Sequence, residues 1–94
     1  MKGDLLRMEL EEYRKEIDEI DEQLVALIAR RMAVSEKIGR FKAQNGMEIY
    51  VPAREQEKLD VLRAASNGYP DETEEIYRLM FRLSRELQQR ITGV

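Results

Sequence analysis

The sequence predicts an all-α fold, with three helices per chain assembled as an intertwined homodimeric helical bundle. Two observations predict the helices: apolar residues recur at alternating intervals of three and four, and pairs containing Asn, Gly or Pro interrupt this pattern between them. A third observation predicts the dimer, because the first helix is too long for a chain of 94 residues to cover. No repeat or linker divides the chain, so we expect a single domain, residues 1–94.

The first helix is expected from about Leu5 to about Gln44. Gly3-Asp4 offers an N-terminal cap, and Asn45-Gly46 supplies residues that accept the left-handed conformation in which many helices end. Nothing between these points breaks the apolar pattern, whose spacing is that of a packed helix stripe. The stripe consists of Leu10, Tyr13, Ile17, Ile20, Leu24, Leu27, Val34, Ile38 and Phe41.

The length of this helix decides the expected assembly. Forty helical residues measure about 60 Å, whereas a compact chain of this size has a radius of gyration of about 12 to 13 Å. The remaining residues cannot cover such a helix. We therefore expect a second copy of the chain to cover the rest, as in an intertwined homodimer.

Two shorter helices are expected at about residues 52–66 and 72–91. Pro52 suits the first turn of a helix, and Asn67-Gly68 ends that helix. Asp71, with Glu74 three residues later, has the pattern of a capping box for the next helix. The apolar positions are Leu59, Leu62 and Ala65 in the first of these helices, and Ile76, Met80, Leu83 and Leu87 in the second.

The composition excludes several classes of function. The chain has no cysteine and no histidine, which removes thiol nucleophiles, most zinc sites and the usual proton shuttle, so we expect no cofactor and no metal. A net charge of −3 argues against nucleic-acid binding. No apolar run reaches the roughly 20 residues of a membrane span, and the N-terminus lacks a signal-peptide pattern, so we expect a cytoplasmic protein without a membrane partner.

One residue does not fit the apolar stripe. In the heptad frame of Leu10, Ile17, Leu24 and Ile38, the position between the last two is Arg31. A buried guanidinium without a partner is costly, so this side chain extends to solvent, pairs with a carboxylate, or binds an anionic ligand. An arginine that sets the register of a helix pair is the more common case when such a residue stands alone.

Two further cations can be placed relative to Arg31. Lys42 lies eleven residues later, about 20° from the same helix face and about 16 Å along the axis, so the two side chains could hold a small anion between them. Arg14 lies seventeen residues before Arg31, about 25 Å away and about 100° around the helix. It could join the same site only from the other chain of an antiparallel dimer.

Polar residues on the two shorter helices add to this set. Arg54 and Glu55 open the second helix, where backbone N–H groups are free and anions are favoured. Ser84 and Gln88 are four residues apart, so they share one face of the third helix. Each residue alone is ordinary on a helix surface, but the combination indicates a site for a small anion.

The residues named above are arranged as in a known family. The strings "YRKEIDEIDEQLVALIARRMAVSEKIGRFK", "PAREQ" and "IYRLMFRLSRELQQ" resemble, in this order, the all-helical (AroQ-class) chorismate mutases. The resemblance spans nearly the whole chain. It implies a homodimer with two sites that rearranges chorismate to prephenate, without covalent or metal catalysis, on the route to phenylalanine and tyrosine.

The resemblance also implies roles for individual residues. It makes Arg14 of the partner chain, Arg31 and Arg54 ligands of the substrate carboxylates, with Ser84 as a helper. It makes Lys42 and Gln88 donors to the ether oxygen of the substrate, and Glu55 the partner of the ring hydroxyl. Val51 stands where well-known members have a loop aspartate, whose contact to the ring hydroxyl is partly through the backbone, so a backbone contact is implied here.

Two alternatives stay open from the sequence. The first is an isochorismate pyruvate lyase of the same fold, against which Glu55 and Ser84 speak, because lyases of this fold lack one or both polar groups at the matching places. The second is a non-enzymatic helical dimerisation or regulatory module, in which Arg31 only sets register. Fusion or association with another enzyme of the shikimate or aromatic pathway is also open.

Overall fold

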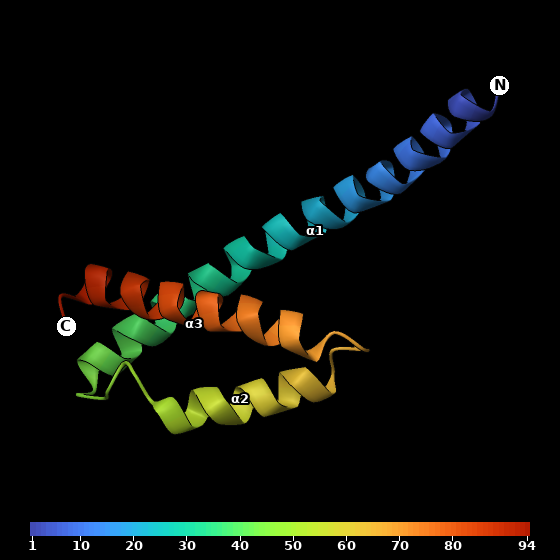
Figure 1. The fold of residues 1–94 in the computed structure, drawn as a ribbon. Coiled ribbons are helices and arrows are strands. Elements are labelled where there is room, and N and C mark those ends of the chain that lie inside the picture. The colour runs from blue at the N-terminus through green and yellow to red at the C-terminus, as the bar shows by residue number, and fades with distance from the viewer. The chain divides into compact units, whose positions relative to one another are not determined.

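The computed structural model describes all 94 residues and contains three helices and no strands, which confirms the all-α prediction. The helices are α1 (Lys2–Gln44), α2 (Pro52–Ala64) and α3 (Pro70–Thr92) (Figure 1). None of them has an apolar stretch long enough to cross a membrane. The chain divides into two units, residues 1–32 and residues 33–94, which we describe separately.

Helix α1 begins earlier than its expected cap at Gly3-Asp4. The amide groups of Asp4 and Leu5 both donate to the carbonyl oxygen of Met1, so the first turn already includes these residues and the helix begins at Lys2. At its other end the Met47 amide donates to the Lys42 carbonyl oxygen at 2.8 Å. Gly46 adopts a positive φ of 62° there, in the left-handed region that glycine enters without steric cost.

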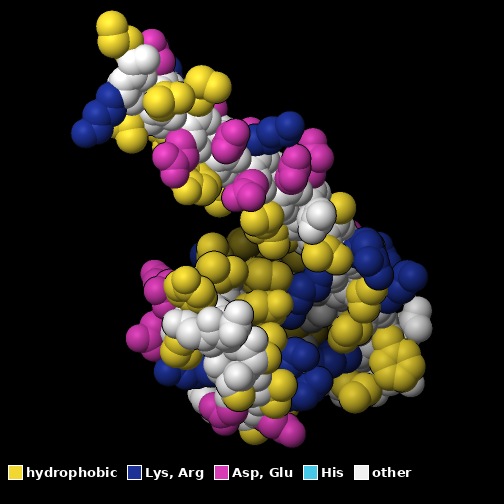
Figure 2. All heavy atoms as spheres, turned by 90° about the vertical axis from the view of Figure 1, so that its right-hand side faces the viewer, with side chains coloured by type: hydrophobic (Ala, Val, Ile, Leu, Met, Phe, Trp, Pro, Cys, Tyr) yellow, Lys and Arg dark blue, Asp and Glu magenta, His cyan; other side chains and the backbone are white.

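The apolar stripe of α1 is not buried within one chain. No residue in the first unit is buried, and Leu10, Ile17 and Leu24 are each about half exposed, at 45%, 56% and 48%. Figure 2 shows hydrophobic side chains on the surface among acidic ones along this helix. A contiguous apolar stripe of this length on a helix surface is characteristic of an interaction face.

The second unit contains the end of α1 together with α2 and α3. Its buried apolar residues are Ile49, Leu59 and Phe81, and Leu59 is only 1% exposed. Helices α2 and α3 lie side by side in opposite directions (Figure 1). Asn67 and Gly68, with φ of 55° and 100°, make the turn between them.

The capping box predicted at the start of α3 is wrong. Helix α3 begins at Pro70, its N-cap is Tyr69, and no side chain caps it. Asp71 and Glu74 instead accept hydrogen bonds from Arg63 in the last turn of α2, at 3.0 and 3.2 Å. The hydrogen bond that Arg63 donates to Asp71 is the main cause of the raised pKa of Arg63. The pairing places negative charge at a helix N-terminus and positive charge at a C-terminus, where the helix dipoles favour them.

The contact between α1 and α3 depends on a glycine. A Cβ atom added to Gly39 would lie 2.6 Å from Gln88 Cγ, 2.9 Å from its Cβ and 3.3 Å from its Cα. Because the last of these is a backbone atom, the helices would have to separate to admit a methyl group. Gly39 therefore sets how closely α3 approaches α1 in this unit.

Truncating the most buried side chain should test the core of the second unit. We expect Leu59→Ala to lower the free energy of unfolding by about 2 to 4 kcal/mol, because it removes apolar contacts and leaves a cavity. Urea denaturation at fixed protein concentration measures the change. The matched control on the same helix is Val61→Ala, since Val61 is 59% exposed. An equal loss of unfolding free energy in Val61→Ala would show that the effect of Leu59→Ala does not come from the burial of Leu59.

Adding a methyl group between α1 and α3 should test their close approach. We expect Gly39→Ala to lower the free energy of unfolding by about 1 to 3 kcal/mol through overpacking. The control is Gly3→Ala, where nothing lies within 4 Å of the added Cβ. Because alanine favours helix over glycine, the control should be neutral or stabilising by up to about 1 kcal/mol. Stability of Gly39→Ala equal to that of the control would contradict the close contact.

Candidate functional site

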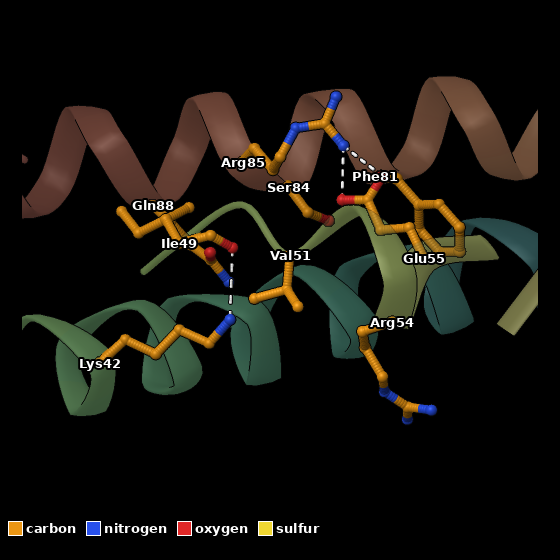
Figure 3. Close-up of a pocket in the computed structure, with 9 residues that line it drawn as sticks. All are labelled: Lys42, Ile49, Val51, Arg54, Glu55, Phe81, Ser84, Arg85 and Gln88. Carbon is orange, nitrogen blue, oxygen red and sulfur yellow. Dashed lines mark hydrogen bonds and ion pairs between the residues drawn. The ribbon is translucent and has the colours of Figure 1, made fainter. Parts of the chain in front are cut away.

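A pocket of about 130 Å³ lies in the second unit. Side chains reach it from the last turns of α1, from the connecting residues 45–51, from the first turn of α2 and from the middle of α3 (Figure 3). Its lining residues are Lys42, Ile49, Val51, Arg54, Glu55, Phe81, Ser84, Arg85 and Gln88.

The pocket gathers six of the eight residues singled out from the sequence, from three helices and one connection. These six are Lys42, Val51, Arg54, Glu55, Ser84 and Gln88. The other two lie on α1 within residues 1–32. There Arg14 is exposed and forms an ion pair with Glu11 at 2.7 Å, while Arg31 is half-buried.

The ammonium group of Lys42 is held at one side of the pocket. Its Nζ donates a hydrogen bond of 3.2 Å to the carbonyl oxygen of Ile49 (Figure 3). This bond joins the last turn of α1 to the connecting residues 45–51. Because an ammonium has three hydrogens, Lys42 can still donate to a ligand while this bond is in place.

The amide group of Gln88 is buried and firmly oriented. Its Nε2 donates to the carbonyl oxygen of Ser35 at 2.8 Å and to the Ser35 hydroxyl at 3.1 Å. Both residues are only 6% exposed. Ser35 was not singled out from the sequence, although Ser35, Gly39 and Lys42 follow one another at four and three residues, the spacing of one helix face.

Glu55 pairs with a residue that sequence reasoning missed. Arg85 Nη1 donates to both carboxylate oxygens of Glu55, and the two side chains point toward one another (Figure 3). The Arg85 guanidinium carbon lies 4.3 Å from the centre of the Tyr50 ring, in cation–π contact. A signal was present in the sequence, because Arg85 stands four residues after Phe81 and three before Gln88, on the same helical face.

The remaining lining residues define the mouth and the wall of the pocket. Arg54 is exposed, and its side chain points away from the pair of Glu55 and Arg85 (Figure 3). Phe81 is 7% exposed and contributes to the apolar wall of the pocket. The Val51 carbonyl oxygen accepts hydrogen bonds from the backbone amides of Arg54 and Glu55.

The charges of the pocket favour an anionic ligand. Lys42, Arg54 and Arg85 supply three cations, and Glu55 is the only carboxylate among the lining residues. Hydrogen-bond donors of this kind bind carboxylates and stabilise developing negative charge. The arrangement can orient a small anion and polarise it.

Comparison with known proteins finds related sequences over most of the chain. The model of the chorismate mutase type II family matches residues 13–89, which confirms the resemblance seen in the sequence motifs. A bifunctional chorismate mutase/prephenate dehydratase of Aquifex aeolicus is 40% identical over 62 residues, which are 65% of this chain and 17% of that protein. A T-protein of Haemophilus influenzae is 39% identical over 54 residues, which are 57% of this chain and 14% of that protein.

A shorter relative matches over most of its length. The intracellular chorismate mutase of Mycolicibacterium smegmatis is 32% identical over 77 residues, which are 82% of this chain and 71% of that protein. The chain thus spans less than a fifth of the length of the first two relatives and most of the third. Because the family model covers most of the chain and includes every pocket residue together with Arg14 and Arg31, this chain belongs to the chorismate mutase type II family.

Proposed function

We propose that the chain is an isomerase that rearranges chorismate to prephenate. The observation that carries the proposal is a pocket, inside the segment matched by the family model, in which Lys42 and Gln88 place hydrogen-bond donors beside further cations. The rearrangement is intramolecular and needs no nucleophile, which suits a chain without cysteine or histidine.

Orientation of the substrate is the first contribution of the protein. Chorismate carries two carboxylates, and its side chain must fold over its ring before the new carbon–carbon bond can form. Arg31 and Arg54 of one chain, with Arg14 of the partner subunit and the hydroxyl of Ser84, hold these carboxylates. Fixing both ends in a reactive conformation lowers the entropic part of the barrier. Arg54 reaches the carboxylate by a change of rotamer, a common adjustment on binding.

Stabilisation of the transition state is the second contribution. Negative charge grows on the ether oxygen as its bond to carbon breaks, so donors aimed at this oxygen stabilise the transition state more than the ground state. Lys42 donates with a hydrogen that its bond to Ile49 leaves available. Gln88 donates by turning toward the substrate the hydrogen that otherwise binds the Ser35 hydroxyl. Glu55 accepts the hydrogen of the ring hydroxyl, beside the backbone of Val51.

A second copy of the chain completes the site. The pocket of about 130 Å³ is smaller than the roughly 300 to 1,000 Å³ of typical small-molecule sites, which supports a site that further chain helps to enclose. The half-exposed apolar stripe of α1 offers the surface by which another α1 would bind. Such a homodimer supplies Arg14 from the partner subunit.

The reaction is tested by adding purified protein to chorismate and identifying the product. We expect prephenate from the wild type and a loss of at least about a hundredfold in kcat/KM for Arg31→Ala, because one carboxylate is no longer held. Circular dichroism and sedimentation should show that the variant stays folded and dimeric. The control is Arg30→Ala, the exposed neighbour on the same helix, which should keep its activity.

Other results would contradict the proposal. Salicylate and pyruvate from isochorismate, with chorismate left unchanged, would assign the lyase reaction instead. No turnover of either compound by a folded dimer would leave a helical module. Normal turnover by Arg31→Ala would remove Arg31 from the site while keeping the reaction.

Mixing two inactive variants should test the shared site. Arg14→Ala and Arg31→Ala each damage both sites of their own homodimers, whereas a mixed dimer keeps one site with both arginines. After equal mixing and full exchange we expect about a quarter of wild-type activity, because half of the dimers are mixed and each has one intact site of two. Exchange is verified by mass spectrometry with one isotope-labelled variant. Exchanged mixtures that stay inactive would show that Arg14 does not act across the interface.

A further inference from the structure

Arg85 links three parts of the pocket and has no part in the mechanism above. From the middle of α3 its Nη1 donates to both oxygens of Glu55 on α2, and its guanidinium lies over the ring of Tyr50 in the connecting residues 45–51. Arg85 and Glu55 are equally shielded, with each side chain 24% exposed. The pair is therefore neither a fully solvated surface pair nor a fully buried one.

We infer that Arg85 is a positioning residue that holds the Glu55 carboxylate as an acceptor and neutralises its charge against a dianionic substrate. This inference rests on the proposed function, because it concerns the same pocket. The inference adds Arg85 to the residues of the proposed mechanism, as one that binds Glu55 rather than the substrate.

The hydrogen-bond geometry leaves Glu55 able to bind a hydroxyl group. One guanidinium nitrogen bridges both carboxylate oxygens, so it uses one acceptor site on each. A carboxylate has about four such sites, so each oxygen keeps another for a ligand. Arg85 thus fixes the plane of the carboxylate without occupying it completely.

The charge balance of the pocket explains why such a cation is needed. Without Arg85, the Glu55 carboxylate would face a substrate that carries two negative charges. The other two lining cations form no ion pair with Glu55, since the Lys42 ammonium lies on the Ile49 carbonyl oxygen and Arg54 points away. Like charges at this degree of burial repel appreciably, so the absence of Arg85 should weaken substrate binding.

Tyr50 keeps the Arg85 side chain in this role. Cation–π contact with the ring holds the guanidinium toward Glu55 and limits its movement to a substrate carboxylate. The same connection carries Ile49, which accepts the hydrogen bond of Lys42. Arg85 therefore also stabilises the segment that positions Lys42.

Steady-state kinetics with chorismate, using the full chain, tests the inference. We expect Arg85→Gln to raise KM about tenfold with a smaller fall in kcat, because uncompensated charge mainly opposes binding. Arg85→Lys should recover most of the loss, because an ammonium can also donate to a carboxylate. The matched control is Arg82→Gln on the same helix, which removes an exposed pair with Glu86 and should leave both constants unchanged.

A double-mutant cycle separates positioning from direct contact with substrate. If Arg85 acts through Glu55, then Arg85→Gln should change KM by less than about twofold in a Glu55→Gln background, where no carboxylate remains to be neutralised. An equal loss in both backgrounds would overturn the inference and make Arg85 a substrate ligand. Denaturation of each variant shows whether a kinetic loss follows from a loss of stability.

The wild type distinguishes the two levels of the proposal. If it converts chorismate and Arg85→Gln matches it, this inference falls and the proposed function stands. If Arg85→Lys is as impaired as Arg85→Gln, charge compensation is overturned as the role of Arg85. If the wild type does not convert chorismate, the proposed function falls and this inference falls with it.

Discussion

The close packing of α1 against α3 at Gly39 is the constraint on which the pocket depends. Only a residue without a side chain permits the backbone of Gln88 to approach this closely, and the approach brings the Gln88 amide to Ser35, 53 residues away in the chain. The same face of α1 carries Lys42. A slightly wider spacing of the helices would separate the two groups that we propose as donors to the ether oxygen. The absence of a side chain at Gly39 therefore sets the distance between these donors.

Each principal polar group of the pocket has a protein partner that holds it in place. Lys42 binds Ile49, Gln88 binds Ser35, and Glu55 binds Arg85. No buried side-chain nitrogen or oxygen lacks a hydrogen-bond partner. These bonds fix where the three groups lie before a ligand arrives. In the proposed mechanism the Gln88 amide gives up the Ser35 hydroxyl and Arg54 changes rotamer when the substrate binds. Donors that the protein holds in place can stabilise negative charge that develops during a reaction.

Local patterns in the sequence were sufficient for most of the fold and for part of the site. The three helices follow from apolar periodicity, and six site residues follow from motifs that the structure gathers in one pocket. The capping box at Asp71 and Glu74 was misread, because Arg63 of another helix competes for both carboxylates. Arg85 was missed for a similar reason. Its partner Glu55 lies 30 residues away in the chain, so spacing along one helix does not reveal the pair.

The sequence by itself determined the helices, the exposed apolar stripe of α1, and the absence of thiol and imidazole side chains. These properties depend on residue type and on spacing along one helix, and both can be read from the sequence. Only the tertiary structure decided that Ser35 orients Gln88, that Ile49 holds Lys42 and that Arg85 neutralises Glu55. Hydrogen bonds and ion pairs act over a few ångströms, so they depend on which helices meet and at what distance.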